Sequence, residues 1–207
     1  PGRVAMAGRW VRLEPLDAGR HARALYAATS GPEAPRLYAY LFDQPPRDLD
    51  EMTRRVEAEA AREDPLGFAV VDAASGEALG RQSLMRIEPA HGVIEIGHIL
   101  WGPRMARSRC ATEAFWLAAE HVFDTLGYRR FEWKCNALNS PSRAAALRFG
   151  FRYEGTFRQH MWVKGRNRDT AWFGMTDGDW RALRPVYREW LDPANFDAGG
   201  RQRHRLG

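Results

Sequence analysis

The chain has 207 residues, of which 44% are hydrophobic and 12% aromatic, a composition typical of a folded protein with a substantial core. This composition excludes a wholly disordered chain, a collagen-like repeat and a low-complexity tract. Lys and Arg number 31 against 26 Asp and Glu, which gives a net charge of +5. A positive balance favours anionic partners such as phosphorylated cofactors.

The sequence contains no run near 18 apolar residues and no basic start leading into an apolar segment. It therefore predicts neither a membrane span nor a secretory leader, and we expect a cytoplasmic protein. Lys and Arg are scattered, which disfavours nucleic acid as a partner. The two cysteines, Cys110 and Cys135, have no His or Cys at metal-ligand spacing, so no metal site is predicted and both thiols are expected to be buried.

Hydrophobic periodicity predicts alternating strands and helices in the first half of the chain. The expected elements are a strand at 10–16, a helix at 18–28, an ordered loop or short turn of helix at 31–48, a helix at 48–62, a hairpin from 68 to 87 and a strand at 93–101. Asp17 is a candidate cap of the first helix. Gly97 lies inside the last of these strands, where glycine marks either a bulge or simple close packing.

The second half continues with mixed elements. We expect a helix at 108–126, a strand at 129–135, a helix from 139 or 140 to 149, strands near 151–158 and 169–176, and a helix at 179–191. Ser108 can cap the first of these helices and Gly127 can end it. With no repeat and no break in composition, the chain is expected to form one domain over 8–192, followed by a tail at 193–207.

Three local motifs are specific enough to indicate a family. They are ATEA at 111–114, the N-x-x-S spacing of Asn139 and Ser142 with GF at 150–151, and RD at 168–169 followed by DW at 179–180. Together they resemble the GCN5-related N-acetyltransferase (GNAT) superfamily, and within it the branch that acetylates ribosomal-protein N-termini. The likeness covers about residues 8–192.

This resemblance implies an α/β fold in which helices flank a central, mixed and mostly antiparallel seven-stranded sheet whose central strands splay apart around acetyl-CoA. It also implies an enzyme that moves an acetyl group, or another acyl group, from acetyl-CoA to a primary amine by direct attack. The acceptor is left open between a protein N-terminus and a small molecule, and a homodimer is compatible with this assignment.

The segment 104–109 runs directly into a predicted helix, whose free N–H groups and positive dipole end favour an anion. In the family's phosphate loop, Arg104 fits the first position only, and Arg107 and Arg109 stand where small residues are expected. Our preferred interpretation is that arginine side chains replace part of the lost backbone contact. The alternative is a degenerate site. The candidate phosphate-binding residues are Arg104, Arg107, Ser108, Arg109, Cys110, Ala111 and Thr112.

A kink at Gly97 would leave backbone groups over 99–101 for the pantetheine arm and would aim an N–H at the thioester oxygen. The residues concerned are Ile99, Leu100 and Trp101. By resemblance, Asn139 holds the pantetheine and Ser142 protonates the departing thiolate. The structural alternative is that both residues only cap the helix that follows.

The sequence identifies the general base less clearly than the residues for phosphate, pantetheine and thiolate. The resemblance places a glutamate seven residues after a Glu-Gly pair such as Glu154–Gly155, but that position is Met161. The substitutes are Glu95 and His98 on the central strand, with His160 beside the failed position, and Glu95 is preferred. Strand alternation puts these two on opposite faces unless a bulge shifts the register.

Aromatic residues in the early loop and a late strand are expected to line the acceptor side, although they could equally serve the core. They are Tyr38, Tyr40, Phe42 and Trp162. The segment 164–169 is interpreted as a solvated basic turn closed by Asn167, and the alternative is a contact for an acidic acceptor or partner chain. A different class of function also fits the altered phosphate loop, namely a catalytically degenerate module that binds acyl-CoA or nucleic acid.

Overall fold

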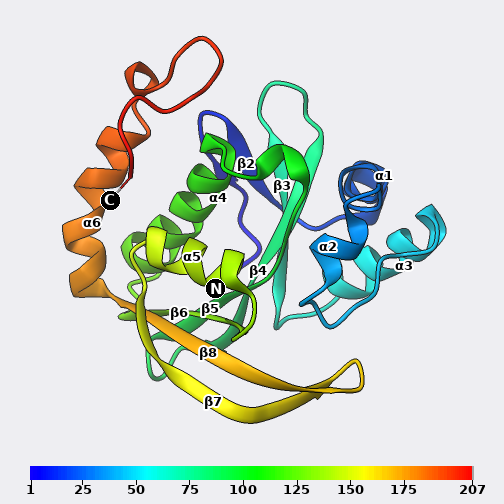
Figure 1. Cartoon of the computed structure of the whole chain (residues 1–207). Helices are drawn as coiled ribbons and strands as arrows, with labels where there is room; N and C mark the ends of the chain where they lie inside the picture. Colours follow the sequence, from blue (N-terminus) through cyan, green and yellow to red (C-terminus); the bar gives the residue numbers. More distant parts are fainter. Residues whose placement is uncertain (207) are drawn as a thin grey trace. The chain divides into compact units, whose positions relative to one another are not determined.

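The computed structural model describes residues 1–206, which form six α-helices and eight strands (Figure 1). Gly207, the last residue of the predicted tail, lies outside the described residues. The chain divides into two compact units: unit 1 comprises 1–87 and 96–118, and unit 2 comprises 88–95 and the chain from Ala119 onward. The architecture is a mixed α/β fold with mostly antiparallel strands and flanking helices, as predicted.

Unit 1 contains an antiparallel meander of four strands. They are β1 (Met6–Ala7), β2 (Val11–Pro15), β3 (Leu66–Asp72) and β4 (Ala78–Glu88). Leu13 pairs with Val70, and Val70 pairs with Gly80 in the next ladder. The two-residue β1 pairs with β2 and is too short to leave a periodic signal, which is why eight strands are found where seven were expected.

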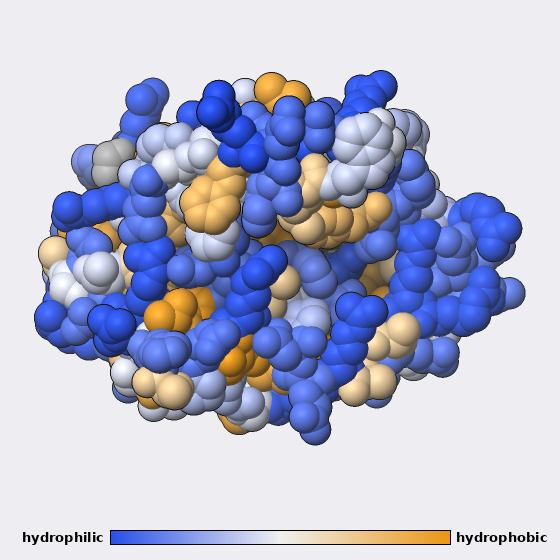
Figure 2. All heavy atoms as spheres, turned by 90° about the horizontal axis from the view of Figure 1, so that it is seen from below, coloured by the Kyte–Doolittle hydropathy of each residue, from blue (hydrophilic) through white to orange (hydrophobic). Residues whose placement is uncertain are grey.

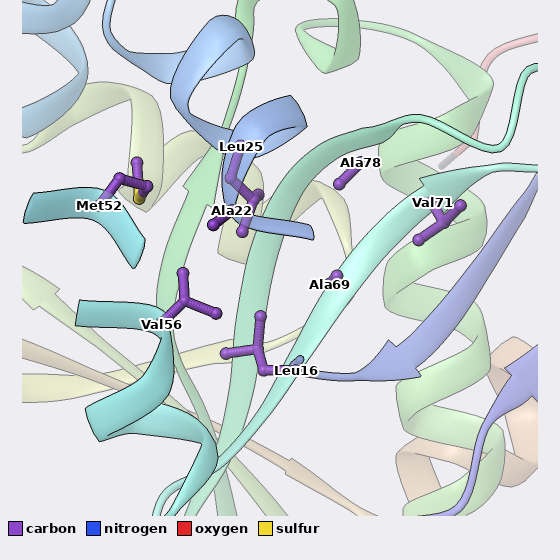
Figure 3. Close-up of a cluster of buried hydrophobic side chains, with 8 residues drawn as sticks. All are labelled: Leu16, Ala22, Leu25, Met52, Val56, Ala69, Val71 and Ala78. Carbon is purple, nitrogen blue, oxygen red and sulfur yellow. The ribbon is translucent and has the colours of Figure 1, made fainter. Parts of the chain in front are cut away.

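Three helices of unit 1 follow its early strands and pack against them. They are α1 (Ala18–Thr29), α2 (Ala34–Tyr38) and α3 (Leu49–Ala60). The side chains of Asp17 and Asp48 cap α1 and α3, accepting N–H bonds at 2.8 and 2.7 Å. Figure 3 shows the apolar core that α1 and α3 form with the strands. Its buried members are Leu16, Ala22, Leu25, Met52, Val56, Ala69, Val71 and Ala78.

The predicted long helix is found as α4 (Arg109–Glu120), followed by a π-helical turn at His121–Thr125. Glu113 of the ATEA motif has a structural role, because its buried carboxylate accepts the backbone N–H groups of Arg9, Trp10 and Val11 at 2.6 to 2.8 Å. A Cβ at Gly8 would approach that carboxyl carbon to 2.5 Å. The motif therefore fastens the chain before β2 to α4 within unit 1.

Unit 2 contains β6 (Arg130–Asn136), α5 (Ser140–Arg148), β7 (Arg152–Val163), β8 (Arg166–Thr176) and α6 (Asp177–Trp190). β8 pairs antiparallel with both β6 and β7. The predicted ends of β7 and β8 were wrong: the strands continue to a two-residue turn at Lys164–Gly165, where φ is 50° and 73°. Asn167 pairs with Trp162 in the ladder and does not close the turn.

The segment after α6 contacts that helix. The indole of Trp190 donates to the Gln202 side chain at 3.1 Å, and Asn195 donates to the Trp190 carbonyl at 2.9 Å. Charged and polar side chains cover most of the face shown in Figure 2, with apolar side chains between them. Among residues 1–206, no helix has the length and apolar character needed to cross a membrane.

Candidate functional site

The start of α4 carries the predicted phosphate-binding segment. A single 3₁₀ turn at Pro103–Met105 precedes it, and Arg107 adopts a left-handed φ of 56°, at a position where the family places a small residue. The Ser108 hydroxyl donates to the Met105 carbonyl at 2.8 Å and accepts from the Ala111 N–H at 3.4 Å. Ser108 thus caps the helix as predicted.

The arginines of this segment give it a positive surface, but two of them already have partners in unit 1. Arg104 lies 3.1 Å from the Glu77 carboxylate, and the Arg109 guanidinium lies 4.9 Å from the ring centre of Trp10. Arg107 is exposed. Cationic groups around a helix N-terminus fit a diphosphate chemically. A phosphate that used Arg104 would have to compete with Glu77.

The other predicted residues of this segment could serve a ligand mainly through their backbone. Thr112 and Ala111 have buried side chains, so only their N–H groups could face an anion. Cys110 is half-buried, which corrects the expectation that both cysteines are fully buried. Burial raises the pKa of the Cys110 thiol, so it is a neutral thiol near pH 7.

The end of β5 (Val93–Trp101) is the predicted pantetheine-binding edge. The left-handed residue in this strand is His98, with a φ of 49°, rather than Gly97 where the irregularity was expected. Close packing instead involves Gly80 of β4: a Cβ there would lie 2.6 Å from the Leu100 carbonyl oxygen and 2.8 Å from the Cα of Trp101. The kink is therefore present but shifted by one residue.

In unit 2, the N-x-x-S motif forms the first turn of α5. Asn139 caps the helix by accepting the Ser142 N–H at 3.1 Å, which confirms the capping role that was the structural alternative. The Ser142 hydroxyl oxygen also accepts the indole N–H of Trp133 at 3.0 Å. Because a hydroxyl can accept and donate at once, this bond fixes the oxygen and leaves its proton available for donation.

Cys135, on β6, has a buried thiol, as predicted. Burial raises the pKa of Cys135, and the Ser142 hydrogen bond opposes that rise only in part. Cys135 is therefore a buried thiol and, like Cys110, is not activated as a nucleophile.

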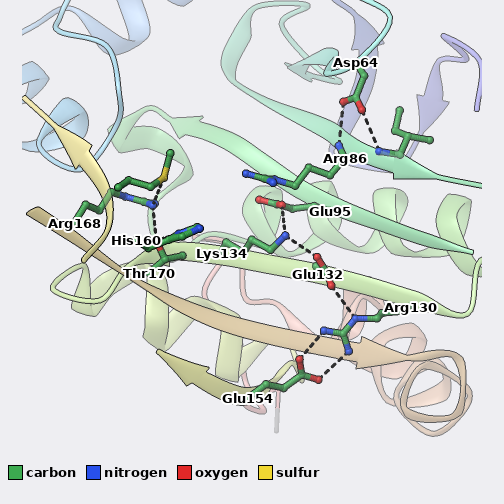
Figure 4. Close-up of polar contacts among 12 residues, drawn as sticks. Asp64, Arg86, Glu95, Arg130, Glu132, Lys134, Glu154, His160, Arg168 and Thr170 are labelled. Carbon is green, nitrogen blue, oxygen red and sulfur yellow. Dashed lines mark hydrogen bonds and ion pairs between the residues drawn. The ribbon is translucent and has the colours of Figure 1, made fainter. Parts of the chain in front are cut away.

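Glu95, the preferred base in the sequence, lies in a buried chain of ion pairs in unit 2 (Figure 4). Its carboxylate is 2.9 Å from the Lys134 ammonium, which is also 2.7 Å from Glu132 and 3.8 Å from the ring centre of Trp172. The side chains of Glu95 and Lys134 are only 6% and 8% exposed. An ammonium at this distance lowers the basicity of a carboxylate, so the geometry favours a structural role for Glu95.

His98, the other candidate base, lines a cavity of about 340 Å³ in unit 1. The wall also contains Tyr38 and Phe42 from the early loop, as predicted for an acceptor side. Tyr40 is exposed and does not line the cavity, and Trp162 on β7 is exposed. The complete lining is Tyr38, Leu41, Phe42, Asp43, Met52, Arg55, Val56, Ala58, Glu59, Arg62, Arg81 and His98.

Five charged residues of this cavity were missed in the sequence, namely Asp43, Arg55, Glu59, Arg62 and Arg81. The signal for Glu59 was present, because Met52, Val56 and Glu59 are spaced by four and three residues and so lie on one face of α3. Arg81 and His98 join it from β4 and β5, and only the packing of these strands could reveal that meeting.

Comparison with known proteins gives a consistent result. The family model for the acetyltransferase (GNAT) domain matches residues 11–152. A GCN5-related N-acetyltransferase from Brucella melitensis is 54% identical, with a TM-score of 0.97 over 100% of this chain and 93% of that chain. A probable GNAT-family acetyltransferase from Chromobacterium violaceum is 42% identical, with a TM-score of 0.81 over 87% and 90% of the two chains.

A remoter structure, spermidine N-acetyltransferase from Vibrio cholerae in complex with CoA and spermine, shares the fold at 19% identity. Its TM-score is 0.66 over 83% of this chain and 98% of that chain. No curated protein matches the sequence. Because the family model spans more than half of the chain and two structures are over 40% identical across most of it, the chain belongs to the GNAT acetyltransferase family.

Proposed function

We propose that this GNAT-family chain is an N-acetyltransferase that moves an acetyl group from acetyl-CoA, or another acyl-CoA, to a primary amine. The observation that carries the proposal is the Ser142 hydroxyl, whose oxygen is fixed by the Trp133 indole at 3.0 Å while its proton stays available. A positioned proton donor is what a departing thiolate requires.

The donor would use groups that the two units provide separately. Backbone N–H groups at the start of α4, with Arg104, Arg107 and Arg109, bind the diphosphate. The edge of β5 over Ile99–Trp101 pairs with the pantetheine amides. In unit 2, Asn139 is the residue that the family motif assigns to the pantetheine, in addition to capping α5.

In this reaction the neutral amine attacks the thioester carbon directly, and an N–H of β5 stabilises the oxyanion. The carbon–sulfur bond then breaks, and the thiolate takes the Ser142 proton, which solvent later replaces. The amine loses its proton to His98, which lines the cavity, in preference to Glu95, which is paired with Lys134. No acyl-enzyme forms, so neither cysteine is needed.

The acceptor class depends on how easily the amine loses a proton. A chain N-terminus has a pKa of about 8, so freeing it at pH 7 costs about 1.4 kcal/mol, whereas a lysine near 10.4 costs about 4.6 kcal/mol. Without the glutamate that the family pattern places at Met161, an amine of low pKa is favoured. The motif likeness to the ribosomal-protein branch supports a protein N-terminus, whereas a small amine of higher pKa would need a base positioned to remove its proton.

The test compares two serines of α5. We expect Ser142→Ala to lower thiol release from acetyl-CoA, in the presence of an amine, by about a hundredfold or more, because a general acid contributes that much. Ser140→Ala is the matched control on the same helical turn and should retain turnover. Unchanged turnover in Ser142→Ala would remove this serine from the mechanism.

A second function is favoured by one observation, the replacement of small residues in the phosphate segment by Arg107 and Arg109. Such a chain could bind acyl-CoA or nucleic acid without turnover. Calorimetry with acetyl-CoA, followed by a thiol assay on the same sample with amine added, separates the two. Heat without thiol release supports the binding module, and heat with release supports the enzyme.

A further inference from the structure

The cavity in unit 1 has apolar walls and a charged floor. Tyr38, Leu41, Phe42, Met52 and Val56 supply the apolar part. Met52 and Val56 also belong to the core beneath α3, so this wall is supported by close packing (Figure 3). A volume of about 340 Å³ suits a small organic molecule.

Glu59 lies at the centre of the charged floor. Its carboxylate accepts from Arg81 at 2.8 Å and from the Ser83 hydroxyl at 3.1 Å, two residues that β-alternation places on one face of β4. The Nδ1 atom of His98 lies 3.9 Å from the same carboxylate. Burial acts to raise the pKa of Glu59, but the interaction with His98 and the charge of Arg81 outweigh it, so the pKa is lowered and Glu59 is an anion at neutral pH.

A carboxylate beside Nδ1 selects one tautomer of an imidazole. The tautomer that it favours has its proton on Nδ1 and its lone pair on Nε2. At 3.9 Å the pair is longer than a hydrogen bond, and catalytic hydrogen bonds often tighten only when substrate binds. His98 also directly precedes the strand edge at 99–101 that is assigned to the pantetheine arm, and its left-handed φ turns the chain at that point.

The charges around the cavity leave no carboxylate for a second cationic group. Asp43 and Glu59 both pair with Arg81, and Arg55 pairs with Glu51 behind the wall. The charged lining is Asp43, Arg55, Glu59, Arg62 and Arg81, in which the guanidinium groups outnumber the carboxylates. A second cationic group of a polycation would therefore have to compete with Arg81 for Asp43 or Glu59.

We propose that this cavity takes a primary monoamine with an apolar body and that Glu59 is the positioning residue for His98. This proposal rests on the proposed transferase function. The ammonium group of the acceptor gives one proton to Nε2 of His98, and the neutral nitrogen then forms its bond to the acyl carbon. As the carbon–sulfur bond breaks, the nitrogen loses its second proton to solvent and the departing thiolate takes a proton from the general acid. The imidazolium, stabilised by Glu59, returns the proton to solvent after the product leaves.

The acceptor class is tested with phenylethylamine and spermidine as probes, using the intact chain and thiol release from acetyl-CoA. We expect kcat/KM to be about tenfold higher or more for phenylethylamine, the ratio expected for about 1.4 kcal/mol of selectivity. Equal or greater activity with spermidine would overturn the monoamine assignment. Failure to release thiol with every amine, despite acetyl-CoA binding, would instead overturn the proposed function itself.

The roles of His98 and Glu59 are tested by changing the pKa of the acceptor amine, which changes how much the reaction depends on a base. With phenylethylamine, His98→Ala should lower kcat about a hundredfold and Glu59→Gln about tenfold, with KM within about twofold. Glu57→Gln, an exposed carboxylate on the same helix, is the control and should leave kcat unchanged. The factor by which kcat falls in the two cavity variants should be at least about tenfold smaller with β,β-difluorophenylethylamine. Its fluorines lower the pKa of the amine, so more of the amine is already neutral and depends less on a base.

A merely structural role predicts a different result. If His98→Ala and Glu59→Gln lose the same factor with the fluorinated and the parent amine, neither residue takes part in proton removal and the assignment fails. Thermal unfolding of each variant identifies one that fails to fold, and in that case His98→Gln, which keeps polar volume without a basic nitrogen, replaces His98→Ala in the same comparison.

Discussion

The molecule contains two clusters of buried charge built from the same ingredients. In unit 1, Glu59 meets Arg81 and His98 on the wall of a cavity. In unit 2, Glu95 meets Lys134, which also meets Glu132 and lies against an indole ring (Figure 4).

The difference lies in what each cluster leaves available. Each carboxylate of the Glu95 cluster has a cationic partner and the cluster is largely shielded from solvent, so its charges serve the packing of the strands. The Glu59 cluster includes the His98 imidazole on the wall of a cavity, where it can exchange a proton with a bound molecule. A buried carboxylate is thus a weak indicator of catalysis unless a proton path reaches it.

The largest expected effect comes from removing the cation of the closed cluster. Lys134→Met should lower the free energy of unfolding by about 3–5 kcal/mol, because Glu95 then stays buried without its partner. Arg81→Met in the open cluster should cost only about 1–3 kcal/mol, since water can reach Glu59. Urea unfolding at neutral pH measures both. Lys164→Met, at the exposed β7–β8 turn, is the control and should change stability by less than about 0.5 kcal/mol.

Equal losses in Lys134→Met and Arg81→Met would contradict this contrast. They would mean that the floor of the cavity is as well shielded from water as the strand cluster, and hence that His98 has no better access to an acceptor than Glu95 has.

Glu95→Gln is expected to have a smaller effect on stability, and it tests directly which residue is the general base. The amide keeps the volume and leaves Lys134 with Glu132, so the loss should be about 1–3 kcal/mol. Turnover per folded molecule should stay within about threefold, because the base is assigned to His98. The measurement pairs a thermal unfolding curve with thiol-release kinetics. A hundredfold fall in kcat with an intact fold would return the base to Glu95.

Much of the fold could be predicted because its signals are local. The strand at 93–101 and the helix capped by Asp17 follow from periodicity and capping alone. The β7–β8 turn was misplaced because Asn167 is a common turn residue, whereas the chain reverses at Lys164–Gly165. The π-helical turn after α4 has no sequence signature, since it depends on how one helical turn accommodates an extra residue.

The same distinction between local and long-range signals applies to the candidate site. Asn139 and Ser142 could be found because three residues separate them and one helix start holds both. Glu59 was missed because its partners, Arg81 and His98, come from two other elements. The preference for Glu95 rested on strand alternation, which cannot reveal that Lys134 of a distant segment neutralises its carboxylate. Long-range pairing, rather than local pattern, decides which charge is available.

The smallest expected effect is on the response of the strand cluster to acid. Burial acts to raise the pKa of Glu132, but hydrogen bonds and charge from Lys134 and Arg130 outweigh it, so its pKa is lowered on folding. The unfolded chain therefore binds more protons in this range, and stability is full above about pH 4.3 and falls as pH drops through the folded pKa. Glu132→Gln should flatten the loss of unfolding free energy between about pH 5 and pH 3, measured by urea titration at each pH. Glu57→Gln, which changes an exposed carboxylate, should leave that slope unchanged, and an equal flattening in both variants would place the acid sensitivity outside the cluster.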